Sequence, residues 1–285
     1  MAVTQAIVEN NINALKDIIE QDEQVLERRI GNTTVLHLAS RFGNAQQVSL
    51  ILELRPEMVI AENANSESPI HEACRMGHER VVRMLMEKNP WVASKLNRED
   101  QSALFLACSY GHLSVVEYLL NHTSWLLDIV DQAACLHVSV AKGRTDIAKK
   151  LLEKCTDLAN LNDIDGSLAL HCACRKGELE ISKMLFGMNP DQALQFDTNG
   201  YTPLHLAAIN GNVAILQEFE SIAPFSFLIL TKHGENVFHL SVRFKRFDAF
   251  KFLASSRKDT YLFYQPDKFG NTIQHLAQME GFHQV

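Results

Sequence analysis

A short phrase recurs along the chain at a nearly constant interval. One copy reads TPLHLAAINGN from Thr202, and seven others share its pattern. The histidine column of these phrases, with one phenylalanine, consists of His37, His71, Phe105, His137, His171, His205, His239 and His275. A regular period of this length indicates a stack of similar units, each of which buries its apolar face against its neighbours.

Two other columns describe the structure of one unit. The residue two after the histidine is Ala or Ser in every copy, which lets a second helix approach closely. Six after it stands glycine, which ends a helix in the left-handed conformation. Lys245 is the exception, and we expect it to strain its turn by about 1 kcal/mol. A second amphipathic segment follows, as in Val81, Val82, Leu85 and Met86. Each unit is predicted to be helix, tight turn, helix and loop.

The phrase, its period and the D-x-x-G turns before it, such as Asp197 to Gly200, resemble ankyrin repeats. The resemblance implies an all-α ankyrin-repeat solenoid of helix-turn-helix units with short hairpin loops. It also implies a single domain over residues 1–285 with about nine repeats. Residues 1–29 fit a degenerate first repeat with Asn10 in the glycine place, and residues 269–285 fit an incomplete last repeat.

Several phrases are also similar to the ankyrin region of plant membrane-anchored ankyrin proteins, among them HEACRMGH and FGNTIQHLA. That similarity implies a role in immune or stress signalling, and it implies transmembrane helices C-terminal to the repeats in relatives. The most apolar run of this chain, APFSFLIL at 223–230, is too short to span a bilayer, so we expect no membrane insertion by these residues.

Composition limits the remaining classes of function. The net charge of -7 is spread without long runs of one sign, which argues against nucleic acid as a partner. The six cysteines form no CxxC pair, as expected of reduced thiols in a cytosolic protein. We therefore predict a cytoplasmic location, with the cytosolic face of a membrane as the alternative.

The histidines are the first candidates for chemistry. The resemblance implies that the column histidine hydrogen-bonds loop backbone near the threonine position and ties a repeat to its neighbour. The nearest metal-ligand cluster is His171, Cys172 and Cys174, and residues one or three apart along a helix do not all face one metal. We predict no catalytic, metal-binding or cofactor-binding residue. An enzyme or metalloprotein that uses the column histidines is the rival hypothesis, and bound metal or turnover would favour it.

The surface is the remaining candidate for function. The resemblance implies that the residues four and five after the histidine point into a concave groove. The predicted partner-binding residues are Arg41, Phe42, Arg75, Met76, Ser109, Tyr110, Lys142, Arg175, Lys176, Ile209, Asn210, Arg243 and Phe244. Six of these are basic, whereas Glu280 is the one acidic residue at such positions.

This charge pattern predicts a non-catalytic protein-protein interaction module or scaffold that binds an acidic or phosphorylated protein segment. Phe42, Tyr110 and Phe244 would be its apolar anchors. A cytosolic regulatory domain of a membrane-anchored protein is the alternative function, and arginine as a well-solvated filler is the alternative explanation of the charges. Reversing Arg75, Arg175 and Arg243 to glutamate should abolish partner capture and, because exposed substitutions cost little, should hardly change stability.

Overall fold

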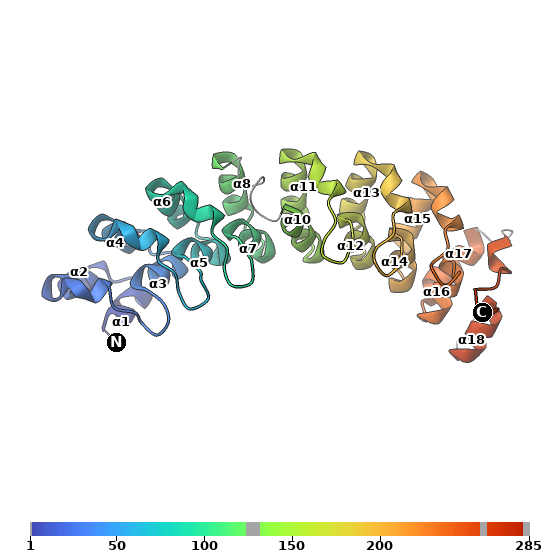
Figure 1. Cartoon of the computed structure of the whole chain (residues 1–285), viewed down its shortest axis with the longest axis horizontal. Coiled ribbons are helices and arrows are strands. Elements are labelled where there is room, and N and C mark those ends of the chain that lie inside the picture. Colours follow the sequence, from blue (N-terminus) through green and yellow to red (C-terminus); the bar gives the residue numbers. More distant parts are fainter. Residues whose placement is uncertain (1, 124–131, 257–260, 282–285) are drawn as a thin grey trace. The chain divides into compact units, whose positions relative to one another are not determined.

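The computed structural model describes residues 2–123, 132–256 and 261–281, and the regular elements of these residues are helices (Figure 1). The chain divides into two compact units, residues 1–138 and residues 139–285. The helix pairs of the first unit are α1 (Ala2–Val8) with α2 (Ile12–Gln21), α3 (Val35–Arg41) with α4 (Ala45–Leu54), α5 (Pro69–Met76) with α6 (Glu79–Lys88), and α7 (Ala103–Tyr110) with α8 (Leu113–His122).

The second unit continues the same pattern. Helix α10 (Gln132–Ala141) crosses the division between the units, and α11 (Thr145–Lys154) follows it. The other elements are α12 (Ala169–Lys176) with α13 (Leu179–Met188), α14 (Pro203–Asn210) with α15 (Val213–Ile222), α16 (Val237–Arg243) with α17 (Phe247–Ser256), and α18 (Ile273–Met279). These pairs confirm the predicted all-α architecture of helix-turn-helix units. The single domain of about nine repeats stays a prediction.

Each unit stacks its helices in two rows. The first helices contact one another, as α3 contacts α5 and α12 contacts α14, and the second helices do the same, as α4 contacts α6 and α13 contacts α15. The apolar residue before the column histidine is buried between first helices, for example Ile70 and Leu204. Prolines after the second helices begin short 3-10 turns, including η3 (Pro90–Ser94) and η5 (Pro190–Leu194). The core therefore runs between successive pairs.

The glycine column is required by packing as well as by backbone conformation. Gly77 has a φ of 77°, and a Cβ on it would lie 2.3 Å from Nδ1 of His112. His112 in turn donates from Nε2 to the Arg75 carbonyl oxygen, 2.9 Å away, so it joins two repeats. His78 does the same to the Arg41 carbonyl oxygen. The sequence shows these histidines in one column but not that each covers the preceding repeat's glycine.

The two places where glycine is replaced adopt the same backbone conformation. Lys245 has a φ of 56° and Asn10 a φ of 51°, so both stand in the left-handed region. The predicted conformation at Lys245 is confirmed. The predicted cost of about 1 kcal/mol stays a prediction. Its size is roughly the free energy by which residues with a Cβ are disfavoured in the left-handed region.

Substituting two glycines separates the effect of backbone strain from that of packing. Gly31→Ala should lower the free energy of unfolding by about 1 kcal/mol, because Gly31 has a φ of 63°. This is backbone strain alone, since a Cβ added to Gly31 would meet no described atom within 4 Å. Gly77→Ala should cost about 1 to 3 kcal/mol more, because the methyl group would also collide with His112. Urea unfolding of both variants measures the difference. Equal losses of unfolding free energy in Gly31→Ala and Gly77→Ala would contradict this account. So would a larger loss in Gly77→Ala that adding His112→Ala to that variant does not reduce.

Candidate partner-binding surface

The column histidines join each repeat to the loop that follows it. Nδ1 of His205 accepts a hydrogen bond from the Thr202 backbone N–H at 3.1 Å, and Nε2 donates to the Ile229 carbonyl oxygen at 3.1 Å. His71 and His171 form the corresponding pairs of bonds. These contacts require the neutral imidazole with its proton on Nε2. They confirm the structural role that the resemblance implies.

Burial keeps these imidazoles neutral. It lowers the pKa of His205 from its ordinary value of 6.5 to about 4, although the Ile229 carbonyl and Asp197 oppose the shift. Burial also lowers the pKa of His37, His71, His171 and His239. A general base works best with a pKa near the operating pH. The hydrogen bonds and the lowered pKa values therefore both favour a structural role for these histidines over a role as a general base.

Besides His275, whose ring is exposed, two members of the column differ from the others. Nδ1 of His137 donates to the Ala133 carbonyl oxygen at 2.6 Å, within its own helix. Phe105 has no ring nitrogen, so its repeat cannot form the two hydrogen bonds, and its half-buried ring lines a pocket instead. The phenylalanine at position 105, where the other copies have histidine, is the sequence feature that marks this pocket. The repeat pattern alone does not predict it.

The structure places the predicted partner-binding residues at or just beyond the C-terminal ends of the first helices, all exposed or half-buried. We call them the groove residues. In the first unit, Phe42, Met76 and Tyr110 are 44%, 48% and 51% exposed and come from three successive repeats. In the second unit Phe244 is exposed and Ile209 is half-buried. That these residues bind a partner stays a prediction.

The groove arginines of the first unit belong to an ion-pair network. Arg75 donates from Nη1 to Glu72 Oε2 at 3.0 Å and from Nη2 to Glu67. Arg41 donates from Nε to the same Glu72 oxygen at 3.0 Å. The Glu72 side chain is only 1% exposed. Burial raises the pKa of Glu67, but the hydrogen bonds from Arg75 and Asn63 outweigh it and hold that pKa below its ordinary value.

Groove arginines of the second unit also pair with buried carboxylates. Arg243 Nη2 lies 2.8 Å from Glu235 Oε1, and Arg175 Nη2 lies 3.8 Å from Asp197 Oδ2. The surface is therefore less positive than the residue types at the groove positions indicate. The interpretation of arginine as a solvated filler is wrong for Arg75, because its guanidinium group is held by two buried carboxylates.

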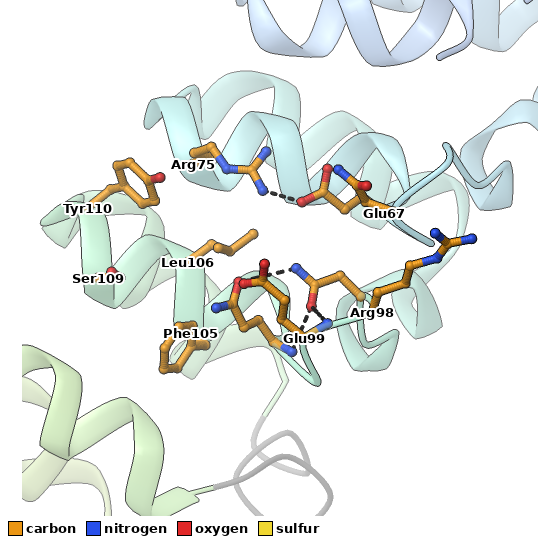
Figure 2. Close-up of a pocket in the computed structure, with 11 residues that line it drawn as sticks. Glu67, Arg75, Arg98, Glu99, Phe105, Leu106, Ser109 and Tyr110 are labelled. Carbon is orange, nitrogen blue, oxygen red and sulfur yellow. Dashed lines mark hydrogen bonds and ion pairs between the residues drawn. The ribbon is translucent and has the colours of Figure 1, made fainter. Parts of the chain in front are cut away.

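A pocket of about 470 Å³ opens between α5, the hairpin loop before α7, and α7 itself (Figure 2). Figure 2 shows Leu106 pointing into the space between the Arg75–Glu67 pair and Glu99 of the loop. The loop is shaped by Asn97, whose Oδ1 accepts hydrogen bonds from two backbone N–H groups at 2.9 Å. Pockets of this size hold small ligands or side chains. Its apolar wall and charged rim suit an anchoring side chain of a bound peptide.

Across residues 2–123, 132–256 and 261–281, no three His, Cys, Asp or Glu side chains come together in a way that could hold a metal ion. None of the helices described there is long and apolar enough to cross a membrane.

The comparisons with known proteins give a family match. The family model for ankyrin repeats in three copies matches residues 3–95, 90–162, 136–219 and 170–263. These overlapping matches extend over most of the chain and include every groove residue. No curated protein matches the chain.

Proposed function

The chain belongs to the ankyrin-repeat family, and we propose that it is a non-catalytic protein-protein interaction module or scaffold that binds a partner segment along the groove residues. Members of this family are interaction modules in general. The observation that carries the proposal is the run of Phe42, Met76 and Tyr110, which are exposed in three successive repeats of the first unit, with Tyr110 also lining the pocket. Exposed aromatic and methionine side chains around a pocket are typical of binding hot spots.

We further propose that the bound segment is acidic or phosphorylated. The support is the set of basic groove residues, of which Lys142 and Lys176 are exposed and Arg41 is partly exposed while Glu72 fixes its guanidinium group. Guanidinium groups held in place lose little freedom when they bind a carboxylate or phosphate. The pairing with internal carboxylates reduces the net charge, so apolar contacts would supply most of the affinity.

The biological setting rests on the sequence phrases alone. We propose a cytoplasmic protein of immune or stress signalling. A regulatory domain at the cytosolic face of a membrane-anchored protein is the alternative. The enzyme hypothesis has less support, because His71, His171 and His205 use both ring nitrogens in structural hydrogen bonds.

Peptides selected from a random displayed library on the full chain test the proposed site. The variant Phe42→Ala/Met76→Ala/Tyr110→Ala should weaken binding of the selected peptides at least about tenfold, which corresponds to about 1.4 kcal/mol. The control is Ile60→Ala/Leu96→Ala/Met188→Ala, three apolar residues that are 46%, 43% and 39% exposed outside the groove positions. Its affinity should stay within about twofold of the wild type.

Isothermal titration calorimetry gives the affinities, and circular dichroism confirms that both variants fold. Equal losses in the two triple variants, or no loss in the groove variant, would contradict the proposed site. Selected peptides without enrichment in acidic residues would contradict the acidic partner and leave the site itself supported.

A further inference from the structure

The exposed apolar groove residues of the first unit occur once in each of three successive repeats, at the same place. Phe42, Met76 and Tyr110 each stand five residues after the column position of their repeat. We call these three residues the apolar row. The first helices at whose ends they lie, α3, α5 and α7, contact one another in order (Figure 1). Because packed helices lie about 8 to 10 Å apart, successive members of the apolar row should have about that spacing.

This spacing limits the conformation of a bound segment. A segment that contacts every member of the apolar row must repeat the direction of its side chains at the same interval. A polyproline II helix does so at every third residue, about 9.3 Å along its axis. A β-strand does so about every 6.6 Å, which does not match. An α-helix matches only at every second turn, about 10.8 Å, so hydrogen bonding has to distinguish the two helices.

Hydrogen-bonding groups beside the apolar row favour the polyproline II helix. The hydroxyl groups of Ser109 and Tyr110 and the side-chain Nε2 of Gln101 line the pocket and have no hydrogen-bond partner among the described residues. Figure 2 shows Ser109 and Tyr110 at one end of the pocket. A polyproline II backbone has no internal hydrogen bonds, so its carbonyl oxygens can accept from such donors. The carbonyl oxygens within an α-helix are already bonded.

The groove arginines indicate where the segment carries its acidic residue. Arg41 uses Nε and Nη2 to bind Glu72, so its Nη1 has no partner among the described residues, and its side chain is 45% exposed. Arg75 donates from both terminal nitrogens, to Glu67 and Glu72, and its side chain is 21% exposed. Of the two, Arg41 is therefore the one open to a further carboxylate. It directly precedes Phe42 in the chain.

We propose that the partner segment binds the first unit as a polyproline II helix, with apolar side chains at three positions spaced three residues apart. An acidic side chain stands next to the apolar residue that contacts Phe42 and pairs with Arg41. The apolar side chain at the other end contacts Tyr110 and enters the pocket beside Leu106. This inference rests on the proposed function, because it specifies the conformation and sequence pattern of the segment that the groove residues bind.

Peptides selected from a random displayed library on the full chain supply the probe. The tightest peptide that the variant Phe42→Ala/Met76→Ala/Tyr110→Ala weakens is labelled with fluorescein, and each of its positions is changed to alanine in turn. Double-mutant cycles by fluorescence anisotropy combine these peptides with the three single protein variants. Each protein variant should couple with one peptide position by at least about threefold, and the three positions should be three residues apart, in the order of the repeats.

Proline substitution tests the conformation of the bound peptide. Proline at the peptide positions between the coupled ones should keep the affinity within about threefold, because it favours polyproline II and removes only backbone N–H groups that this helix does not use. The same prolines would break an α-helix. The control for coupling is Ile60→Ala, an apolar residue 46% exposed outside the groove positions, which should couple with no peptide position.

The acidic contact has its own pair of variants. Arg41→Gln should weaken the peptide about fivefold, and should hardly change the affinity of a peptide with asparagine or glutamine in place of the acidic residue. The control is Arg83→Gln, because Arg83 also pairs with a glutamate, Glu79, but lies on α6. It should affect neither peptide. Equal losses for both peptides with Arg41→Gln would overturn the acidic contact.

Failure of this inference can be told from failure of the proposed function. Coupled positions at any spacing other than three, no coupling, or loss of binding on proline substitution would overturn the polyproline II helix. The proposed function would still stand, because the probe is chosen for its dependence on the apolar row. If none of the selected peptides were weakened by the triple variant, the proposed site would be contradicted and this inference with it.

Discussion

Arg75→Glu is expected to lower the free energy of unfolding by about 3 kcal/mol or more, since removing one partner of a buried ion pair leaves an uncompensated charge. Glu72 and Glu67 are nearly inaccessible to solvent and both accept hydrogen bonds from Arg75. The substitution replaces that cation with a third carboxylate. Arg41 would still neutralise Glu72 in part, through the bond from Nε. Urea unfolding followed by circular dichroism measures the loss.

Lys176→Glu is the control with the same change of charge at a groove position. Lys176 is exposed, and exposed substitutions usually change stability by no more than about 0.5 kcal/mol. If Arg75→Glu also lowered the free energy of unfolding by no more than about 0.5 kcal/mol, the ion-pair network of Arg75 would contribute little to stability, as is common for exposed ion pairs. For the same reason, a binding experiment on the groove should not use Arg75→Glu, because a lost partner and a destabilised repeat would give one result.

Acidification from pH 7.0 to pH 5.5 is expected to destabilise the protein through the histidine column. The pKa of His205 is about 4 in the folded chain and 6.5 ordinarily, so between these values the unfolded chain binds more protons. Stability is therefore fully present above pH 6.5 and is lost as the pH falls toward 4. His205 alone should contribute a loss of about 1 kcal/mol at pH 5.5. His37, His71, His171 and His239 contribute losses of the same sign.

Carboxylates affect a lower pH range. The pKa of Asp267 lies below its ordinary 3.8, because hydrogen bonds from Asn271 and Phe269 outweigh burial, and that of Glu67 lies below 4.5. Their stabilisation is present above those ordinary values and is lost below them, outside the interval from pH 7.0 to 5.5. The interval therefore reports mainly on histidine.

Variants identify the residue responsible. His205→Gln removes the titrating ring. Between pH 7.0 and pH 5.5, the free energy of unfolding of this variant should therefore fall by about 1 kcal/mol less than that of the wild type. His275→Gln, at the exposed member of the column, should reproduce the wild-type dependence. Urea unfolding of the three proteins at both pH values gives the comparison. An unchanged dependence in His205→Gln would show that its burial does not control its protonation.

The sequence by itself determined the repeat, because the features that define it are local. A histidine three residues after the N-cap reaches back to it by helix geometry, as His205 does to Thr202. A residue in the glycine place must enter the left-handed region for the chain to turn, which is why Lys245 and Asn10 could be located in advance. The two helices of each pair and the positions of the groove residues follow from the same period.

Tertiary structure alone decided how one repeat acts on the next. Arg41 and Glu72 are 31 residues apart, and the pattern of either repeat gives no indication that their side chains meet. His112 covers Gly77, and Phe105 lines a pocket in place of a hydrogen-bonded histidine, for the same reason. Such contacts depend on which side chains of neighbouring repeats come within bonding distance after stacking. The charge of the groove was therefore readable from the sequence, but its neutralisation by buried carboxylates was not.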